Sequence, residues 1–248
     1  YSIISDGYGG LWVASLEYLL HFDIDKRNFT IVDVDEDGHK LQQYNRLLFC
    51  DSKKRIWAGG EMGISVFNQV GTSLLPNTDF QIASVLKQAF VNCFYETSSG
   101  YLWIGTRNGL FALKESDKQF LQYTTENGLP SNVIYGILED AYGRLWISTN
   151  QGLSCLNPES GKFRNFTIMD GLQGNQFNAG AYCRKDNGYM LFGGVNGITS
   201  FRPETLIDNP YAPKPVINKL FVHNKEVLPD DETGILKESI TYVNRITL

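Results

Sequence analysis

The sequence predicts an all-β protein built from five repeated sheets of a β-propeller. Three observations carry this prediction. A tryptophan-centred motif recurs along the chain, a glycine follows it at a fixed distance in nearly every copy, and short strands of alternating polarity fill the intervals. A repeat of about 45 residues is typical of one four-stranded propeller blade.

The motif centres on a large apolar side chain at the same position of each copy. Successive centres lie 45, 46, 43 and 45 residues apart, and a glycine follows six residues later in every copy except the first, where Tyr18 stands. We interpret the centres as structural side chains that pack between neighbouring sheets, with the leucine marking a terminal blade. They are Trp12, Trp57, Trp103, Trp146 and Leu191.

The fourth copy illustrates the strands expected in each blade. Alternating apolar residues predict a first strand over 133–140, and a glycine-containing turn precedes a second strand at 145–149. Third and fourth strands are expected over 153–156 and 163–167. In the first copy, residues 14–24 can also be read as a short helix, but the repeat favours strands.

Four prolines after the last motif interrupt the repeat and favour an extended linker. They are Pro203, Pro210, Pro213 and Pro215. We therefore expect blades over 1–207 and a separate small β module over 208–248, with strands at 216–222 and 240–248 and a turn at Asn224–Lys225. Tyr1 reads as mid-strand, which indicates a fragment. Five blades can close a ring alone, but part of a larger ring is favoured.

Composition and motifs argue against several classes of function. The net charge of −5 argues against a nucleic-acid-binding face, and no apolar stretch is long enough to span a membrane. The four cysteines form no C-x-x-C pair and are interpreted as buried free thiols, while the three histidines show no metal-binding spacing. No nucleophile–base pattern occurs, so no enzyme activity, cofactor or metal is expected.

Two parts of the repeat resemble a known family, the two-component regulator propeller. The resemblance is carried by Asn127-Gly128-Leu129-Pro130, Asp140, Gly143, Trp146 and Gly152, and, for the family's closing repeat, by Asn175, Phe177-Asn178, Gly193-Gly194 and Phe201-Arg202-Pro203-Glu204. Residues 213–227 and 240–248 resemble the opening of the immunoglobulin-like triple-tyrosine domain. The resemblance implies a seven-bladed ring and the periplasmic sensor region of a Bacteroides-type hybrid two-component system.

This resemblance implies a function for the chain as part of a sensor histidine kinase. The expected ligand is an oligosaccharide, whose binding controls polysaccharide-utilisation genes through a kinase encoded elsewhere in the protein. A homodimer through the propeller or the C-terminal module is expected, with membrane attachment only through a downstream segment. The alternatives are a propeller polysaccharide lyase or glycosidase and a pure interaction scaffold, because fold alone does not separate these functions.

Candidate ligand contacts lie on one face of the expected propeller. Loops that enter the first strands share this face with the turns between second and third strands, and they are rich in amides, arginine and aromatic residues that bind hydroxyls, carboxylates or sulfates. The predicted ligand-binding residues are Tyr44, Asn45, Arg46, Arg107, Asn108, Asn132, Tyr135, Asn150, Phe177, Asn178 and Asn196. The aspartates of the opposite face, such as Asp51 and Asp140, are interpreted as turn formers.

Overall fold

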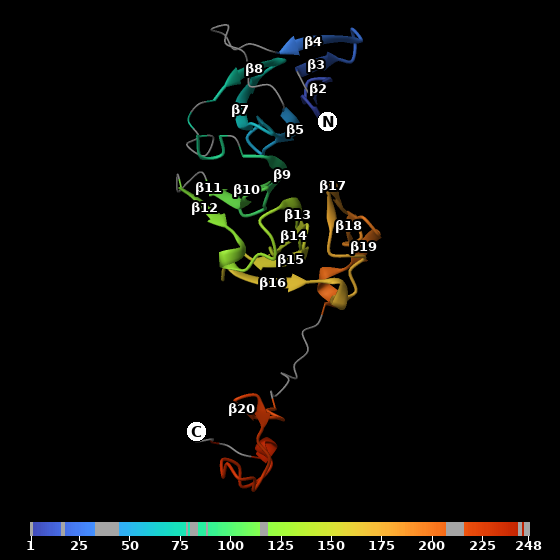
Figure 1. Ribbon diagram of the computed structural model, residues 1–248. Coiled ribbons are helices and arrows are strands. Elements are labelled where there is room, and N and C mark those ends of the chain that lie inside the picture. Colours follow the sequence, from blue (N-terminus) through green and yellow to red (C-terminus); the bar gives the residue numbers. More distant parts are fainter. Residues whose placement is uncertain are drawn as a thin grey trace. The chain divides into compact units, whose positions relative to one another are not determined.

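The computed structural model describes residues 2–15, 18–32, 45–77, 79, 84–87, 89–114, 119–206, 216–242 and 245. The chain divides into two compact units, Tyr1–Thr205 and Leu206–Leu248. The first unit holds five antiparallel sheets that follow one another along the chain (Figure 1). The second unit is small and is described separately below.

Four of the sheets are four-stranded meanders with the strand order of a propeller blade. Blade 1 comprises β1 (Ser2–Ser5), β2 (Gly10–Ala14), β3 (Leu19–Asp23) and β4 (Asn28–Val32); blade 2 comprises β5 (Asn45–Cys50), β6 (Arg55–Gly60), β7 (Gly63–Val70) and β8 (Ser73–Pro76). Blade 3 comprises β9 (Val91–Glu96), β10 (Tyr101–Thr106), β11 (Gly109–Lys114) and β12 (Gln119–Tyr123); blade 4 comprises β13 (Ile134–Glu139), β14 (Leu145–Thr149), β15 (Gly152–Asn157) and β16 (Lys162–Phe166). The all-β propeller prediction is confirmed, and residues 19–23 form a strand rather than a helix.

The fifth sheet has three strands in the described residues instead of the four expected. These are β17 (Phe177–Arg184), β18 (Met190–Gly194) and β19 (Gly197–Phe201). A short 3-10 helix, Pro203–Thr205, follows β19 directly. Proline has no amide hydrogen to donate to a strand partner, so Pro203 ends the ladder at this point.

The tryptophans pack between successive blades, as predicted. Each lies on one face of its sheet and contacts the opposite face of the next sheet along the chain. All four are between 0% and 2% exposed. Trp146, for example, packs with Phe177, Met190 and Phe192 of blade 5. This repeated contact gives each pair of neighbouring sheets its own hydrophobic core, since a single sheet cannot bury both of its faces alone.

The innermost strands also contact each other from blade to blade, in the order β1, β5, β9, β13, β17. Gly136 of β13 makes one of these contacts possible, because a Cβ atom at this position would collide with the ring of Tyr182 from β17. Burial holds the pKa of the Tyr182 phenol well above its usual range. A neutral aromatic ring therefore fills the space between blades 4 and 5 near the centre.

The second unit contains a hairpin of two short strands and a small core. The strand expected over 216–222 is wrong except at its last two residues, because 216–220 form no strand. β20 (Phe221–Val222) pairs with β21 (Lys225–Glu226), and His223 and Asn224 form the turn with positive φ angles of 48° and 64°. The turn therefore lies one residue earlier than Asn224–Lys225. Its core is formed by Val227, Leu236 and Ile240.

The prediction of a strand over 240–248 is wrong for its first three residues. Ile240–Tyr242 form a 3-10 helix, with the amide of Tyr242 donating to the carbonyl of Ser239 at 2.9 Å. Ile240 is 7% exposed and is the only buried side chain of this short helix, whereas a strand would bury alternate side chains. Except for Arg245, the rest of that range lies outside the described residues.

Candidate functional site

Two of the predicted ligand-binding residues meet at one aromatic ring. The guanidinium carbon of Arg107 lies 3.7 Å from the ring centroid of Phe90, and that of Arg46 lies 5.9 Å from the same centroid. Arg46 also forms an ion pair with Glu61, at 2.5 Å between Nη2 and Oε1. These four residues come from blades 2 and 3 and are called the arginine cluster below.

The local backbone fixes the position of Arg107 in this cluster. Its amide donates to the carbonyl of Phe90 at 3.0 Å, which brings the β10–β11 turn against the loop that enters β9. Gly109 completes the turn with a φ of 120°, a conformation that favours glycine. The amide of Gly109 then donates to the carbonyl of Asn132 at 2.8 Å, linking this turn to blade 4.

The two arginines differ in their electrostatic partners. Glu61 neutralises the charge of Arg46. Because both side chains are more than a third exposed, this ion pair adds little to the stability of the fold. Among the described residues, Arg107 contacts the ring of Phe90 and forms no ion pair or side-chain hydrogen bond. The cluster therefore presents one ordered, exposed guanidinium whose donors suit a carboxylate, sulfate or phosphate.

The other predicted residues do not all join this cluster. Tyr44 and the side chain of Asn45 lie outside the described residues. Asn108 is exposed beside Arg107. The Oδ1 of Asn132 accepts from the amide of Thr125 at 2.9 Å, so this asparagine stabilises its own loop.

Blades 4 and 5 hold the remaining predicted residues. Phe177 is 1% exposed and belongs to the core, which removes it from the ligand-contacting surface in this structure. Tyr135 is partly buried against the same core. The Oδ1 of Asn150 is buried and has no hydrogen-bond donor among the described residues. Asn178 and Asn196 are exposed.

Phe90 is a member of the arginine cluster that the sequence did not predict. It precedes β9 by one residue, outside the tryptophan motif, and an isolated phenylalanine in a loop carries no recognisable signal. Its role follows only from the two arginines that approach it from different turns. The only sequence feature that points to Phe90 is its place directly before the first strand of a blade.

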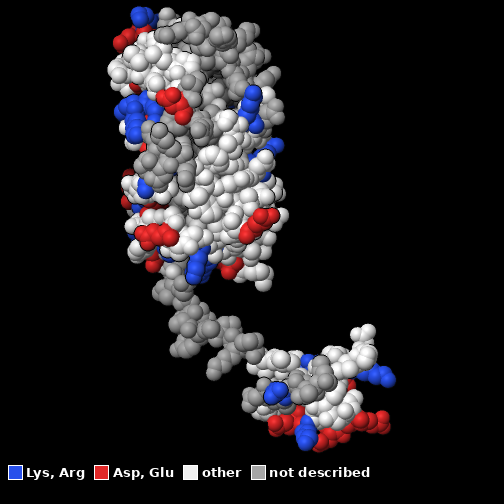
Figure 2. Space-filling view, turned by 90° about the vertical axis from the view of Figure 1, so that its left-hand side faces the viewer, with Lys and Arg blue, Asp and Glu red and all other residues white. Residues whose placement is uncertain are grey.

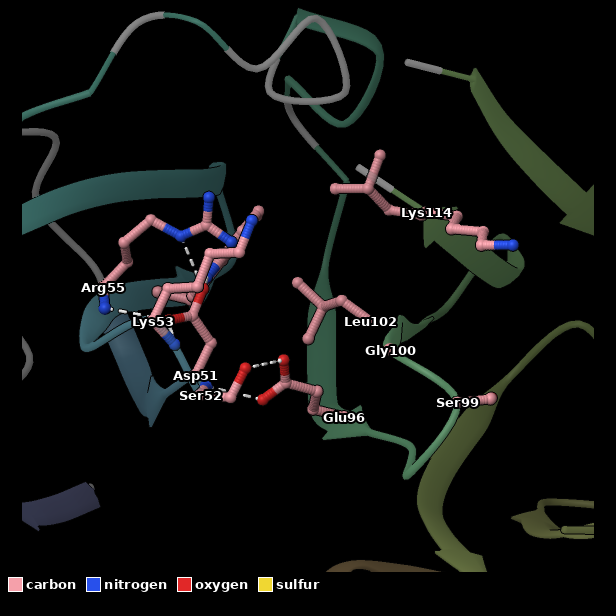
Figure 3. A pocket seen from close by; sticks show the side chains of 11 residues that line it. Asp51, Ser52, Lys53, Arg55, Glu96, Ser99, Gly100, Leu102 and Lys114 are labelled. Atoms are coloured by element: carbon pink, nitrogen blue, oxygen red, sulfur yellow. Dashed lines mark hydrogen bonds and ion pairs between the residues drawn. The ribbon is translucent and has the colours of Figure 1, made fainter. Parts of the chain in front are cut away.

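The opposite face of the propeller carries the aspartate turns and a series of pockets between blades. The pocket between blades 2 and 3 has a volume of about 280 Å³. Arg55, Lys114 and Glu96 are among the residues that line it (Figure 3). The Ser52 amide and hydroxyl both donate to the Glu96 carboxylate at 2.7 Å, which joins the two blades. Similar pockets lie between blades 1 and 2 and between blades 3 and 4.

The described residues offer no metal centre, and two of the cysteines are buried thiols with raised pKa values. They contain no group of three or more His, Cys, Asp or Glu side chains that can hold a metal ion. Burial raises the pKa of Cys93 to about 12 and that of Cys155 to about 11, so both thiols stay protonated at neutral pH. This fits the interpretation of these two cysteines as buried free thiols. Cys50 is only half-buried, and the expectation is wrong for Cys183, which is exposed.

Surface charge on the propeller is sparse in the view of Figure 2. Basic and acidic residues form small separate groups, and most of the described surface is uncharged. A continuous basic face for nucleic acid is therefore not seen on this side. None of the helices in the described ranges has the length and hydrophobicity of a membrane-spanning segment.

The sheets, the tryptophan spacing and the loop geometry define a β-propeller with regulator-type repeats. The two-component regulator propeller family matches residues 86–108 and 128–151, so these repeats are present in the chain. The chain is 28% identical over 237 residues to histidine kinase P4 of Formosa agariphila. That match covers 92% of this chain and 17% of the relative, so the chain spans about a sixth of the relative's length.

Solved structures support the fold. The extracellular domain of the hybrid two component system BT3049 from B. thetaiotaomicron is similar with a TM-score of 0.73 and 22% identity, over 93% of this chain and 32% of that one. Virginiamycin B lyase from Staphylococcus aureus is similar with a TM-score of 0.52 and 16% identity, over 83% of this chain and 70% of the lyase. Sensor ectodomains and an enzyme therefore share this architecture.

Proposed function

We propose that the chain is the ligand-sensing part of the extracytoplasmic domain of a hybrid two-component sensor, and that it binds an acidic glycan fragment. The arginine cluster is the observation that supports an acidic ligand. The regulator repeats and the similarity to a histidine kinase support the sensor assignment.

The cluster suits an acidic sugar for two physical reasons. Stacking on Phe90 restricts the side chain of Arg107 before any ligand arrives, which reduces the entropy lost on binding. The guanidinium can then donate two parallel hydrogen bonds to a carboxylate or sulfate. Exposed amides nearby, such as that of Asn108, can hydrogen-bond the hydroxyls of the same sugar.

In this proposal the chain senses and does not catalyse. Binding at the arginine cluster biases a two-state receptor, because a ligand shifts an equilibrium only when it contacts the two states differently. The C-terminal unit, which is the start of a triple-tyrosine module in this proposal, transmits the binding signal. The receptor acts as a homodimer in the periplasm. The output is the control of genes for polysaccharide use.

The test is calorimetric titration of the whole chain with matched pairs of oligosaccharides. One pair is tetragalacturonate and its neutral methyl ester; the other is a chondroitin sulfate tetrasaccharide and its desulfated form. We expect the charged member of at least one pair to bind and its neutral partner to bind at least about tenfold more weakly. Binding of neither member of either pair, or release of new reducing ends during incubation, would contradict the proposal.

A further inference from the structure

The pocket between blades 3 and 4 differs from its counterpart between blades 2 and 3. It has a volume of about 260 Å³ and lies on the face opposite the arginine cluster. Four aromatic residues, Tyr101, Trp103, Tyr123 and Tyr142, are among the residues that line it. Trp103 and Tyr123 stack with their ring centroids 5.9 Å apart.

The difference has a local cause in the repeat. In blade 2, Asp51 accepts hydrogen bonds from Trp57 Nε1 at 2.9 Å and from Arg55 Nε at 2.6 Å, and Figure 3 shows Arg55 reaching this carboxylate. Blade 4 repeats the arrangement with Asp140, Arg144 and Trp146. In blade 3, the aspartate is replaced by Thr97 and the arginine by Tyr101.

This replacement leaves one buried donor unpaired. The Nε1 of Trp103 is buried and has no hydrogen-bond acceptor among the described residues; the Nε1 of Trp12 is unpaired as well, in a blade where Asp6 pairs with His21. The hydroxyl of Thr97 is already engaged with Ser99 and with the backbone of Tyr101. A buried N–H without an acceptor is unfavourable, so an occupant that supplies an acceptor is favoured.

The lining restricts the chemistry of that occupant. Glu139 is held by the amide and hydroxyl of Ser98 at 3.0 and 2.9 Å, and Glu159 adds a second carboxylate to the lining. Two carboxylates disfavour an anion. A simple ammonium ion suits aromatic walls but has no acceptor to offer the indole. A neutral ring with hydroxyl groups supplies acceptors and also has an apolar surface to lie on the aromatic side chains.

We propose that this pocket is a second binding site, which takes a neutral pyranose ring with a hydroxyl oxygen accepting from Trp103 Nε1. The site is independent of the acidic ligand at the arginine cluster, because it lies on the other face and uses no residue of that cluster. The chain therefore has separate binding sites for the acidic and for the neutral residues of a glycan.

The test follows the indole N–H signals of the whole chain by ¹H–¹⁵N correlation NMR. The chain has four tryptophans, and the indole signal that is lost in Trp103→Phe is assigned to Trp103. The probes are the methyl glycosides of glucose, galactose and mannose at tens of millimolar. We expect at least one of them to shift the Trp103 signal in a saturable way, while Trp57, already paired with Asp51, does not shift.

Two variants convert blade 3 to the pattern of its neighbours. Thr97→Asp supplies the missing acceptor, and Thr97→Asp with Tyr101→Arg also places an arginine in the pocket. Both should weaken the pyranoside affinity by at least about tenfold without lowering thermal stability. Thr72→Asp, in an exposed turn of blade 2, is the matched control and should leave the affinity unchanged.

Three results would overturn the site. The first is an unchanged Trp103 signal with every pyranoside. The second is full binding retained in the double variant. The third is a shift caused by tetramethylammonium chloride and by none of the sugars, which would make the pocket a cation site.

Discussion

The indole Nε1 of Trp146 donates a hydrogen bond to Oδ2 of Asp140 at 3.0 Å, and this bond ties the turn of blade 4 to its core. The same carboxylate accepts from Arg144 Nε at 2.7 Å and from the amides of Tyr142 and Arg144 at 2.9 and 3.0 Å. Asp140 is 4% exposed. One buried charge therefore closes the β13–β14 turn and orients the tryptophan that packs against blade 5.

Replacing Asp140 by alanine should lower the free energy of unfolding by about 3–5 kcal/mol, because it leaves Arg144 and the indole without their buried acceptor. Urea unfolding followed by tryptophan fluorescence measures the loss. Asp186→Ala removes an exposed aspartate from the corresponding turn of blade 5 and should change stability by less than about 0.5 kcal/mol. Equal effects of the two substitutions would contradict this role.

Two tryptophans at equivalent positions should respond differently to phenylalanine. Trp146→Phe loses both volume and the bond to Asp140, whereas Trp103→Phe loses volume but removes an unpaired N–H. We expect Trp103→Phe to be the milder change by about 1–2 kcal/mol, while alanine at either position costs about 3–5 kcal/mol through the cavity it creates. Denaturant midpoints of the four variants make the comparison, and a milder Trp146→Phe would count against it.

The serine–glutamate contacts between blades should show measurable coupling. The amide and hydroxyl of Ser98 donate to the Glu139 carboxylate, as those of Ser52 do to Glu96. A double-mutant cycle with Ser98→Ala and Glu139→Gln should give a coupling free energy of about 1–2 kcal/mol, because the acceptor is charged. Additive effects would show that this contact does not hold blades 3 and 4 together.

Blade 1 should lose stability in acid through Asp6. Burial alone raises the pKa of this carboxyl, but the hydrogen bonds from His21 and from the amides of Tyr8 and Gly10 outweigh it, so the folded pKa lies below the ordinary 3.8. The stabilisation is therefore present at pH values above the ordinary pKa of 3.8 and is lost as the pH falls through the folded pKa.

The measurement is unfolding free energy from about pH 5 to about pH 2.5, the range in which a depressed carboxyl titrates. The native chain should lose more stability over this range than Asp6→Asn. Asp25→Asn, in the exposed β3–β4 turn, should follow the native curve. Parallel curves for the native chain and Asp6→Asn would refute the role of this carboxylate.

Spacing alone predicted the fold because the period of the tryptophans sets the period of the sheets. Trp146 and Asp140 were both identified from the repeat, and the structure adds the bond between them. Phe90 was not predicted, since its partners Arg46 and Arg107 approach it from turns of two different blades. The 3-10 helix at Ile240 was also missed, because a short apolar run does not distinguish a strand from a turn that buries one side chain.

The central claim is that Arg107, ordered by Phe90, binds the acidic group of a glycan ligand. Its most direct measurement is the dissociation constant of the acidic oligosaccharide for the native chain, Arg107→Gln and Arg164→Gln. Arg164 is the matched control, because its guanidinium also lies over a phenylalanine, at 4.7 Å from the ring of Phe166 on the outer strand of blade 4. We predict that Arg107→Gln weakens binding by about 10- to 100-fold, as expected for losing a charge-assisted bidentate contact, and that Arg164→Gln has no effect. Unchanged affinity in Arg107→Gln, or an equal loss in both variants, would contradict the claim.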